Sequence, residues 1–159
     1  MGADIYYESD LFEAKNQALD NCLAAEKGTP DGEEMLLRYR KALDDVEQSS
    51  DYFRDSYNSS NLLWQYDLSW WRDIGVVLDE DGHLPIAEAV KLRDIIQAKE
   101  IDKERVYKTF GESEYPFGEP VTDPDELEEW YDYFVNKRIE FLNILNRSIE
   151  NNKPLYCSV

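Results

Sequence analysis

An acidic segment mixed with aromatic residues spans residues 112–132. It holds nine Asp or Glu residues and no Lys or Arg. Carboxylates gathered around aromatic side chains suit a surface that binds a basic partner, because the charges attract it and the rings anchor it. The same acids also suit a solvated loop and the start of a helix, where the helix dipole favours negative charge. As a partner-binding surface, the segment would use Glu112, Glu114, Tyr115, Glu119, Asp125, Glu128, Glu129, Trp130 and Asp132.

A second candidate site lies in residues 51–78, which hold most of the tryptophans together with arginine, aspartate and asparagine. Aromatic clusters at irregular spacing are typical of a core, with nearby polar side chains satisfying buried Tyr and Trp atoms. The alternative is a pocket in which an arginine meets an anion. That pocket would be lined by Arg54, Asp55, Tyr57, Asn58, Trp64, Trp70, Trp71 and Arg72.

Metal and nucleophile chemistry find little support in the motifs. Four positions match a calcium-binding loop, but Val77 stands where the first ligand should be and has no side-chain oxygen. His83 is the only histidine, and its glycine-containing turn suggests an exposed position. We therefore predict no metal and no cofactor, and no residue set specifies an enzyme. The four matching positions are Asp79, Asp81, Gly82 and Glu88.

The net charge narrows the class of partner. The chain has 35 Asp and Glu residues against 17 Lys and Arg, which gives −18 at pH 7. This charge repels nucleic acid and anionic membrane surfaces and favours a basic partner, although solubility is its simplest role. No apolar run is long enough to span a membrane. Cys22 and Cys157 are expected to be free thiols in a reducing cytoplasm.

Hydrophobic periodicity predicts a mainly α fold, a single compact domain of five or six helices over residues 1–159. The longest helix should cover residues 123–150, with Asp123 as its cap, Pro124 in its first turn and Glu126 completing a capping box. Residues 2–8 and 155–159 have the composition of short strands, and a two-strand pairing would bring the two ends of the chain together. Further helices are expected at residues 10–27, 33–48 and 84–100, with short ones near Asn61 and Ser69.

Four fragments together resemble a family of small uncharacterised proteins carried by bacteriophages and their hosts. They are Met1-Gly-Ala-Asp-Ile-Tyr, Tyr52-Phe-Arg-Asp-Ser-Tyr-Asn, Leu68-Ser-Trp-Trp and Cys157-Ser-Val. The resemblance covers most of the chain and brings no activity, cofactor or catalytic residue with it. It does imply a phage-related role. By analogy, some compact acidic phage proteins mimic nucleic acid and occupy the groove of a host defence protein.

These patterns predict a non-catalytic acidic interaction protein that binds a basic partner, such as a host nucleic-acid-binding or defence protein. A phage-encoded inhibitor that mimics the charge of nucleic acid is one form of this hypothesis. The second interpretation is a small-ligand-binding protein or enzyme with its pocket in residues 51–78. The patterns indicate no oligomeric state.

Overall fold

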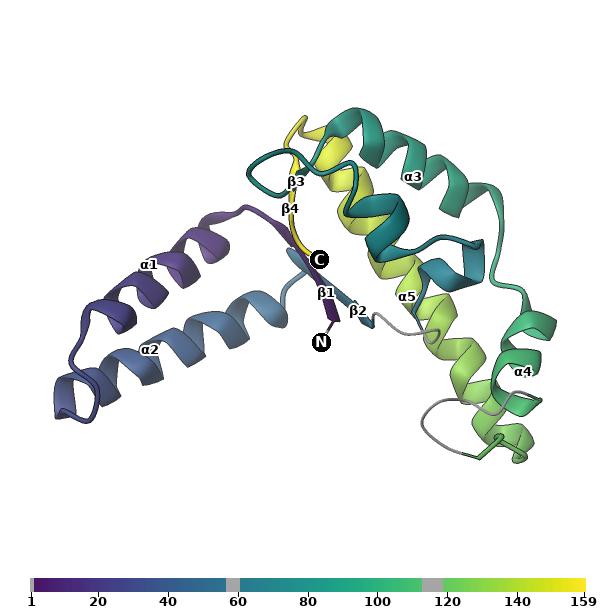
Figure 1. Cartoon of the computed structure of the whole chain (residues 1–159), viewed down its shortest axis with the longest axis horizontal. Helices are drawn as coiled ribbons and strands as arrows, with labels where there is room; N and C mark the ends of the chain where they lie inside the picture. The colour runs from purple at the N-terminus through teal and green to yellow at the C-terminus, as the bar shows by residue number, and fades with distance from the viewer. Residues whose placement is uncertain (1, 57–60, 113–118) are drawn as a thin grey trace.

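A four-stranded antiparallel sheet lies at the centre of the computed structural model, which describes residues 2–56, 61–112 and 119–159 (Figure 1). The strand order is β2-β1-β4-β3. The strands are β1 (Gly2–Tyr7), β2 (Tyr52–Ser56), β3 (His83–Leu84) and β4 (Leu155–Ser158). The prediction of a mainly α domain with at most a two-strand pairing is therefore wrong, because the chain has an α+β fold.

Strands β2 and β3 were not predicted from the sequence, and each omission has a physical reason. Strand β1 pairs with β4, but β2 and β3 flank that pair. On β2 the inward positions are Phe53 and Asp55, both buried, so a carboxylate interrupts the apolar alternation that marks a strand. Strand β3 has only two residues, too few for any periodicity.

The two faces of the sheet bury different side chains, because alternate residues of a strand point to opposite sides. From β1, Ala3 and Ile5 enter the main core. Tyr6 instead packs with Phe12 and Val46 in a smaller cluster. One face of the sheet therefore supports the main core, and the other supports the base of a helical hairpin.

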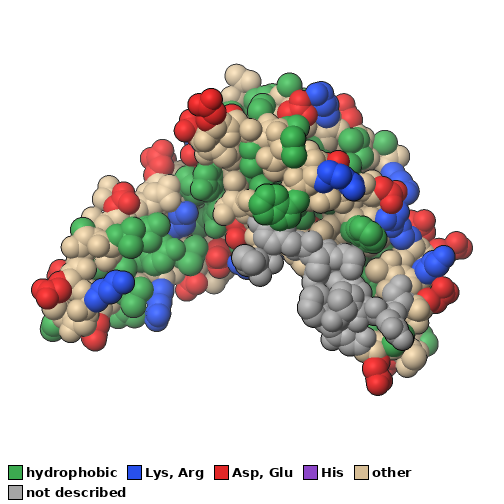
Figure 2. Space-filling model, in the orientation of Figure 1, with side chains coloured by type: hydrophobic (Ala, Val, Ile, Leu, Met, Phe, Trp, Pro, Cys, Tyr) green, Lys and Arg blue, Asp and Glu red, His purple; other side chains and the backbone are tan. Residues whose placement is uncertain are grey.

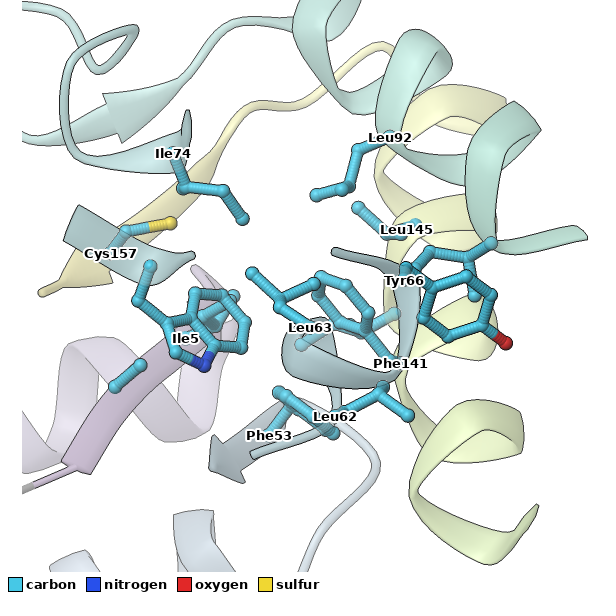
Figure 3. Close-up of a cluster of buried hydrophobic side chains, with 14 of the residues drawn as sticks. Ile5, Phe53, Leu62, Leu63, Tyr66, Ile74, Leu92, Phe141, Leu145 and Cys157 are labelled. Carbon is cyan, nitrogen blue, oxygen red and sulfur yellow. The ribbon is translucent and has the colours of Figure 1, made fainter. Parts of the chain in front are cut away.

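Helices and short helical turns from residues 63 to 150 build the main core on that face of the sheet (Figure 1). They are α3 (Ile86–Ala98), α4 (Lys103–Gly111) and α5 (Pro124–Glu150), with the short helical turns η1 (Leu63–Tyr66) and η2 (Trp70–Ile74). Side chains from the strands, the turns and α5 converge in this core (Figure 3). Phe141 of α5 stacks on Phe53 at 4.7 Å between ring centroids and meets Trp70 edge-on at 5.5 Å.

Helix α5 begins where its cap was predicted. The Asp123 carboxylate accepts a hydrogen bond from the backbone N–H of Asp125, and Pro124 is the first helical residue. At about 1.5 Å per residue the helix is roughly 40 Å long, so it crosses the main core and still presents a surface stripe near its start. No helix within the described ranges is both long and apolar enough to cross a membrane.

An antiparallel hairpin of α1 (Asp10–Ala24) and α2 (Pro30–Glu47) projects away from the rest of the molecule (Figure 1). Ser9 and Thr29 cap the two helices through their side-chain oxygens. Most of the hairpin is exposed, and its three buried residues are Phe12, Lys15 and Val46. The hairpin is therefore anchored mainly at its base, where it meets the sheet.

Candidate functional site

One stripe of α5 lines an open hollow near the start of the helix. The hollow has a volume of about 400 Å³. Its lining residues are Glu126, Glu129, Trp130 and Tyr133. They are spaced three, four and seven positions apart, so they fall on one face of the helix. The helix thus places two carboxylates beside two aromatic rings.

Packing against α4 holds the two rings in place. Trp130 stacks on Phe110 of α4, with the ring centroids 4.3 Å apart and the planes 14° from parallel. Tyr133 stands nearly at right angles to Trp130, at 5.6 Å and 78°. The Tyr133 ring also meets Phe134 edge-on at 5.2 Å. Two aromatic walls therefore meet in a corner that is supported from behind by the core.

The carboxylates around this corner have no counterion among the described residues. Asp125, Glu126, Glu129 and Asp132 are exposed, and none of them forms an ion pair with a described Lys or Arg. Figure 2 shows acidic side chains at several separate places on this face, on the hairpin and on the rest of the molecule, so negative charge by itself does not mark a site. The combination of unpaired carboxylates with the aromatic corner distinguishes this stripe.

Glu128, predicted to face a partner, is engaged within the chain. Its carboxylate lies 2.5 Å from Lys103 Nζ and accepts a hydrogen bond from the Tyr107 hydroxyl. The hydrogen bond from the Lys103 ammonium lowers the pKa of Glu128. Glu128 therefore links α5 to α4 and is not free to bind an external cation.

The other residues of the predicted acidic surface are less informative. Glu112 and Glu119 are exposed. Glu114 and Tyr115 lie outside the described residues. Sequence reasoning omitted Glu126 and Tyr133 from the site, although their helical spacing from Trp130 offered a signal. The support from Phe110 carried no such signal, because it depends on how α4 packs against α5.

The described residues of the predicted pocket in residues 51–78 are divided between β2 and the two helical turns. Trp70 is buried in the core, whereas Trp64 and Trp71 are 46% and 67% exposed. Arg72 pairs with its neighbour Asp73 at 2.9 Å. The remaining members Tyr57 and Asn58 fall outside the described residues, and Arg54 pairs with Asp4 at 3.5 Å.

Asp55 is the most unusual polar residue of that stretch, because its carboxylate is buried among apolar side chains. It accepts hydrogen bonds from the backbone N–H groups of Leu62 at 2.6 Å and Ser56 at 2.9 Å, and from the Trp70 indole at 3.2 Å. Burial nevertheless raises the pKa of Asp55 to about 7. A group that titrates near neutral pH inside the core links protonation to stability.

A second hollow adjoins the corner on the other side of the Tyr133 ring. It has a volume of about 350 Å³, and Arg54, Asp55, Tyr133 and Lys137 contribute to its lining. The Lys137 ammonium donates a hydrogen bond to the Arg54 carbonyl at 2.9 Å and lies 5.8 Å from the centre of the Tyr133 ring. This neighbouring hollow is therefore already supplied with cations from the chain itself.

The histidine and the two cysteines form no common site among the described residues. His83, expected to be exposed, is only 21% exposed, and its Nε2 lies 3.2 Å from a Glu8 carboxylate oxygen. Cys22 and Cys157 are free thiols. Across the part of the chain that the structure describes, no group of three His, Cys, Asp or Glu residues is placed to hold a metal ion. Comparisons with protein families, curated proteins and solved structures find no match to this chain.

Proposed function

We propose that this chain is a non-catalytic acidic interaction protein that binds a basic partner through the start of α5. The single observation that carries the proposal is the aromatic corner of Trp130 and Tyr133, which lies beside the unpaired carboxylates of Glu126 and Glu129. Interfaces of this kind combine a central aromatic anchor with a charged rim. Most exposed acids of the chain lack such an anchor.

The two kinds of residue have different tasks in this proposal. The carboxylates attract the partner over about one Debye length, ~8 Å at physiological salt, and so raise the association rate. The rings bury contact area after the encounter and slow dissociation. Binding should therefore weaken with salt mainly through its association rate.

A nucleic-acid-binding protein is the class of basic partner that this charge pattern favours. Glu126, Glu129 and Asp132 recur every third residue, which is about 4.5 Å along the helix axis. Phosphates of one DNA strand follow each other every ~3.4 Å along the duplex axis. A row of carboxylates at similar spacing offers such a protein a surface resembling that of its natural ligand, as an inhibitor would.

The test compares two triple variants that change the net charge by the same amount. The site variant carries Glu126→Lys, Glu129→Lys and Asp132→Lys. The control variant carries Asp10→Lys, Glu13→Lys and Asp20→Lys on α1, where the acids are also exposed and also include the first helical turn. Circular dichroism and denaturant unfolding check that both variants fold.

Each protein is immobilised and exposed to a bacterial lysate at low and at high salt. We expect the wild type and the control to retain one basic protein at low salt and the site variant to lose it. High salt should release this basic protein from the wild type and from the control variant. Equal retention by all three proteins, or no retained protein at low salt, would overturn the proposal.

The alternative of a small-ligand pocket in residues 51–78 has less support. Arg54 on β2 pairs with Asp4 of β1, whereas Arg72 on η2 pairs with Asp73, and the two arginines line no common hollow among the described residues. The indole of Trp70 faces Asp55 in the core and not a cavity open to a ligand. The acidic stripe of α5 is therefore the stronger basis for a function.

A further inference from the structure

We infer that the corner between Trp130 and Tyr133 receives an arginine side chain of the partner; this inference rests on the proposed function and names the group that the same site recognises. A cation of any kind would satisfy the carboxylates. The shape and support of the aromatic walls, however, favour a flat guanidinium over a compact ammonium.

The Trp130 ring borders the hollow. Phe110 takes one face of the ring, since the two ring planes are only 14° from parallel with their centroids 4.3 Å apart, so the opposite face is the one on which a ligand can stack. Among the described residues, no cation lies over the Trp130 ring. Indole is the best of the aromatic rings for attracting a cation to its face, and a guanidinium can also stack on it as a plane.

Tyr133 forms the second wall and separates the corner from the neighbouring hollow. Its ring borders both spaces. Of these two hollows, Lys137 lines the neighbouring one, and its ammonium lies 5.8 Å from the Tyr133 ring centre. Lys137 therefore supplies a cation to the neighbouring hollow, whereas no described Lys or Arg lines the corner beside Trp130.

Glu126 and Glu129 provide hydrogen-bond acceptors at the rim for either kind of cation. A guanidinium has five N–H donors in a fixed plane, so it can stack on Trp130 and still donate to a carboxylate. An ammonium is more strongly hydrated and has no flat face, so it gains less from the indole when it loses water. The corner should therefore discriminate between two side chains of equal charge.

The test uses two synthetic peptides of equal length and charge, acetyl-Gly-Arg-Gly-Arg-Gly-Arg-Gly-amide and its lysine counterpart. Binding to the folded full-length chain is followed at low salt by the indole and backbone N–H signals in ¹H–¹⁵N NMR spectra, so that affinities can also be measured in variants that lack Trp130. Trp130→Phe assigns the Trp130 signal. The indole of Trp70, bonded to Asp55 in the core, is the internal reference that should not move.

We expect the arginine peptide to shift the Trp130 signal and to bind about threefold to tenfold more tightly than the lysine peptide. In Glu126→Gln/Glu129→Gln, both peptides should weaken by a similar factor. In Trp130→Phe, which keeps a ring against Phe110, the preference for arginine should shrink.

Other outcomes distinguish the recognition of arginine from the binding of any basic partner. Equal affinity for both peptides, with the Trp130 signal shifted, would overturn the arginine inference and leave the basic-partner proposal standing. If neither peptide moves the Trp130 signal at low salt, both fail together. A preference for arginine that survives unchanged in Trp130→Phe would place the recognition elsewhere and overturn the inference.

Discussion

The buried carboxyl of Asp55 should make the stability of this protein fall as the pH rises from about 4 to about 7. Its pKa is raised to about 7 in the folded chain, from an ordinary value of 3.8. Between these values the folded state binds a proton that the unfolded state has released, so higher pH favours unfolding. Below about pH 4 both states are protonated, and above about pH 7 both are ionised.

The size of this effect follows from the pKa difference of roughly three units. Each unit corresponds to about 1.4 kcal/mol, so the free energy of unfolding should decrease by up to about 4 kcal/mol across the window. Asp55→Asn removes the titration while keeping a side-chain oxygen for the N–H groups of Leu62 and Trp70. Its stability should therefore lack this slope.

The assay is urea unfolding of both proteins at half-unit steps from pH 2.5 to pH 8, followed by tryptophan fluorescence. The difference between wild type and variant isolates Asp55, because the other titrating groups are common to both. Stabilities that run parallel through the whole range would refute the reasoning. If the difference in the free energy of unfolding between the two proteins changes only below pH 4, the hydrogen bonds from the N–H donors, and not burial, determine the pKa of Asp55.

Three further predictions concern stability. Phe141→Ala should cost about 3–5 kcal/mol in the free energy of unfolding, because its ring is fully buried against two aromatic neighbours; denaturant titration measures it. Arg147→Ala should cost about 1–3 kcal/mol by leaving the buried Asp51 carboxylate without its cation, and Arg147→Lys should recover part of this loss in the same assay. Amide hydrogens of α1 and α2 should exchange faster than those of the second half of α5, since the hairpin buries few side chains; mass spectrometry of exchanged peptides would show equal rates if this is wrong.

The parts of the fold that sequence reasoning predicted are those set by local chemistry. The start of α5 depends on two adjacent residues, Asp123 as the cap and Pro124 in the first turn, so it could be predicted from the sequence. Strand β2 depends on distant groups, because Asp55 is tolerated inside only through N–H donors from Leu62 and Trp70. No local pattern reveals those donors.

In the candidate site, too, composition predicted some features, and others depend on contacts between distant parts of the chain. The acidic and aromatic residues of α5 stood out by composition, and Trp130 was included on that ground. Whether a given acid is available to a partner depends on its neighbours in space. Glu128 meets Lys103 across two helices, whereas Glu129, the next residue, meets no described cation. Adjacent glutamates therefore differ in whether a described cation pairs with them, and sequence spacing cannot reveal this difference.

The position of β4 in the sheet has a consequence for how the chain is made. Strands β1 and β2 can pair early in synthesis, but β4 lies between β1 and β3 and is synthesised after the other described elements. Until then β1 and β3 each keep an unpaired edge, and the apolar face of α5 lacks part of the surface that it packs on. Such long-range pairing slows folding and exposes strand edges to aggregation. A nascent chain stalled before Leu155 should therefore be sensitive to proteolysis and dependent on chaperones, whereas a chain that includes β4 should close its sheet in a single late step.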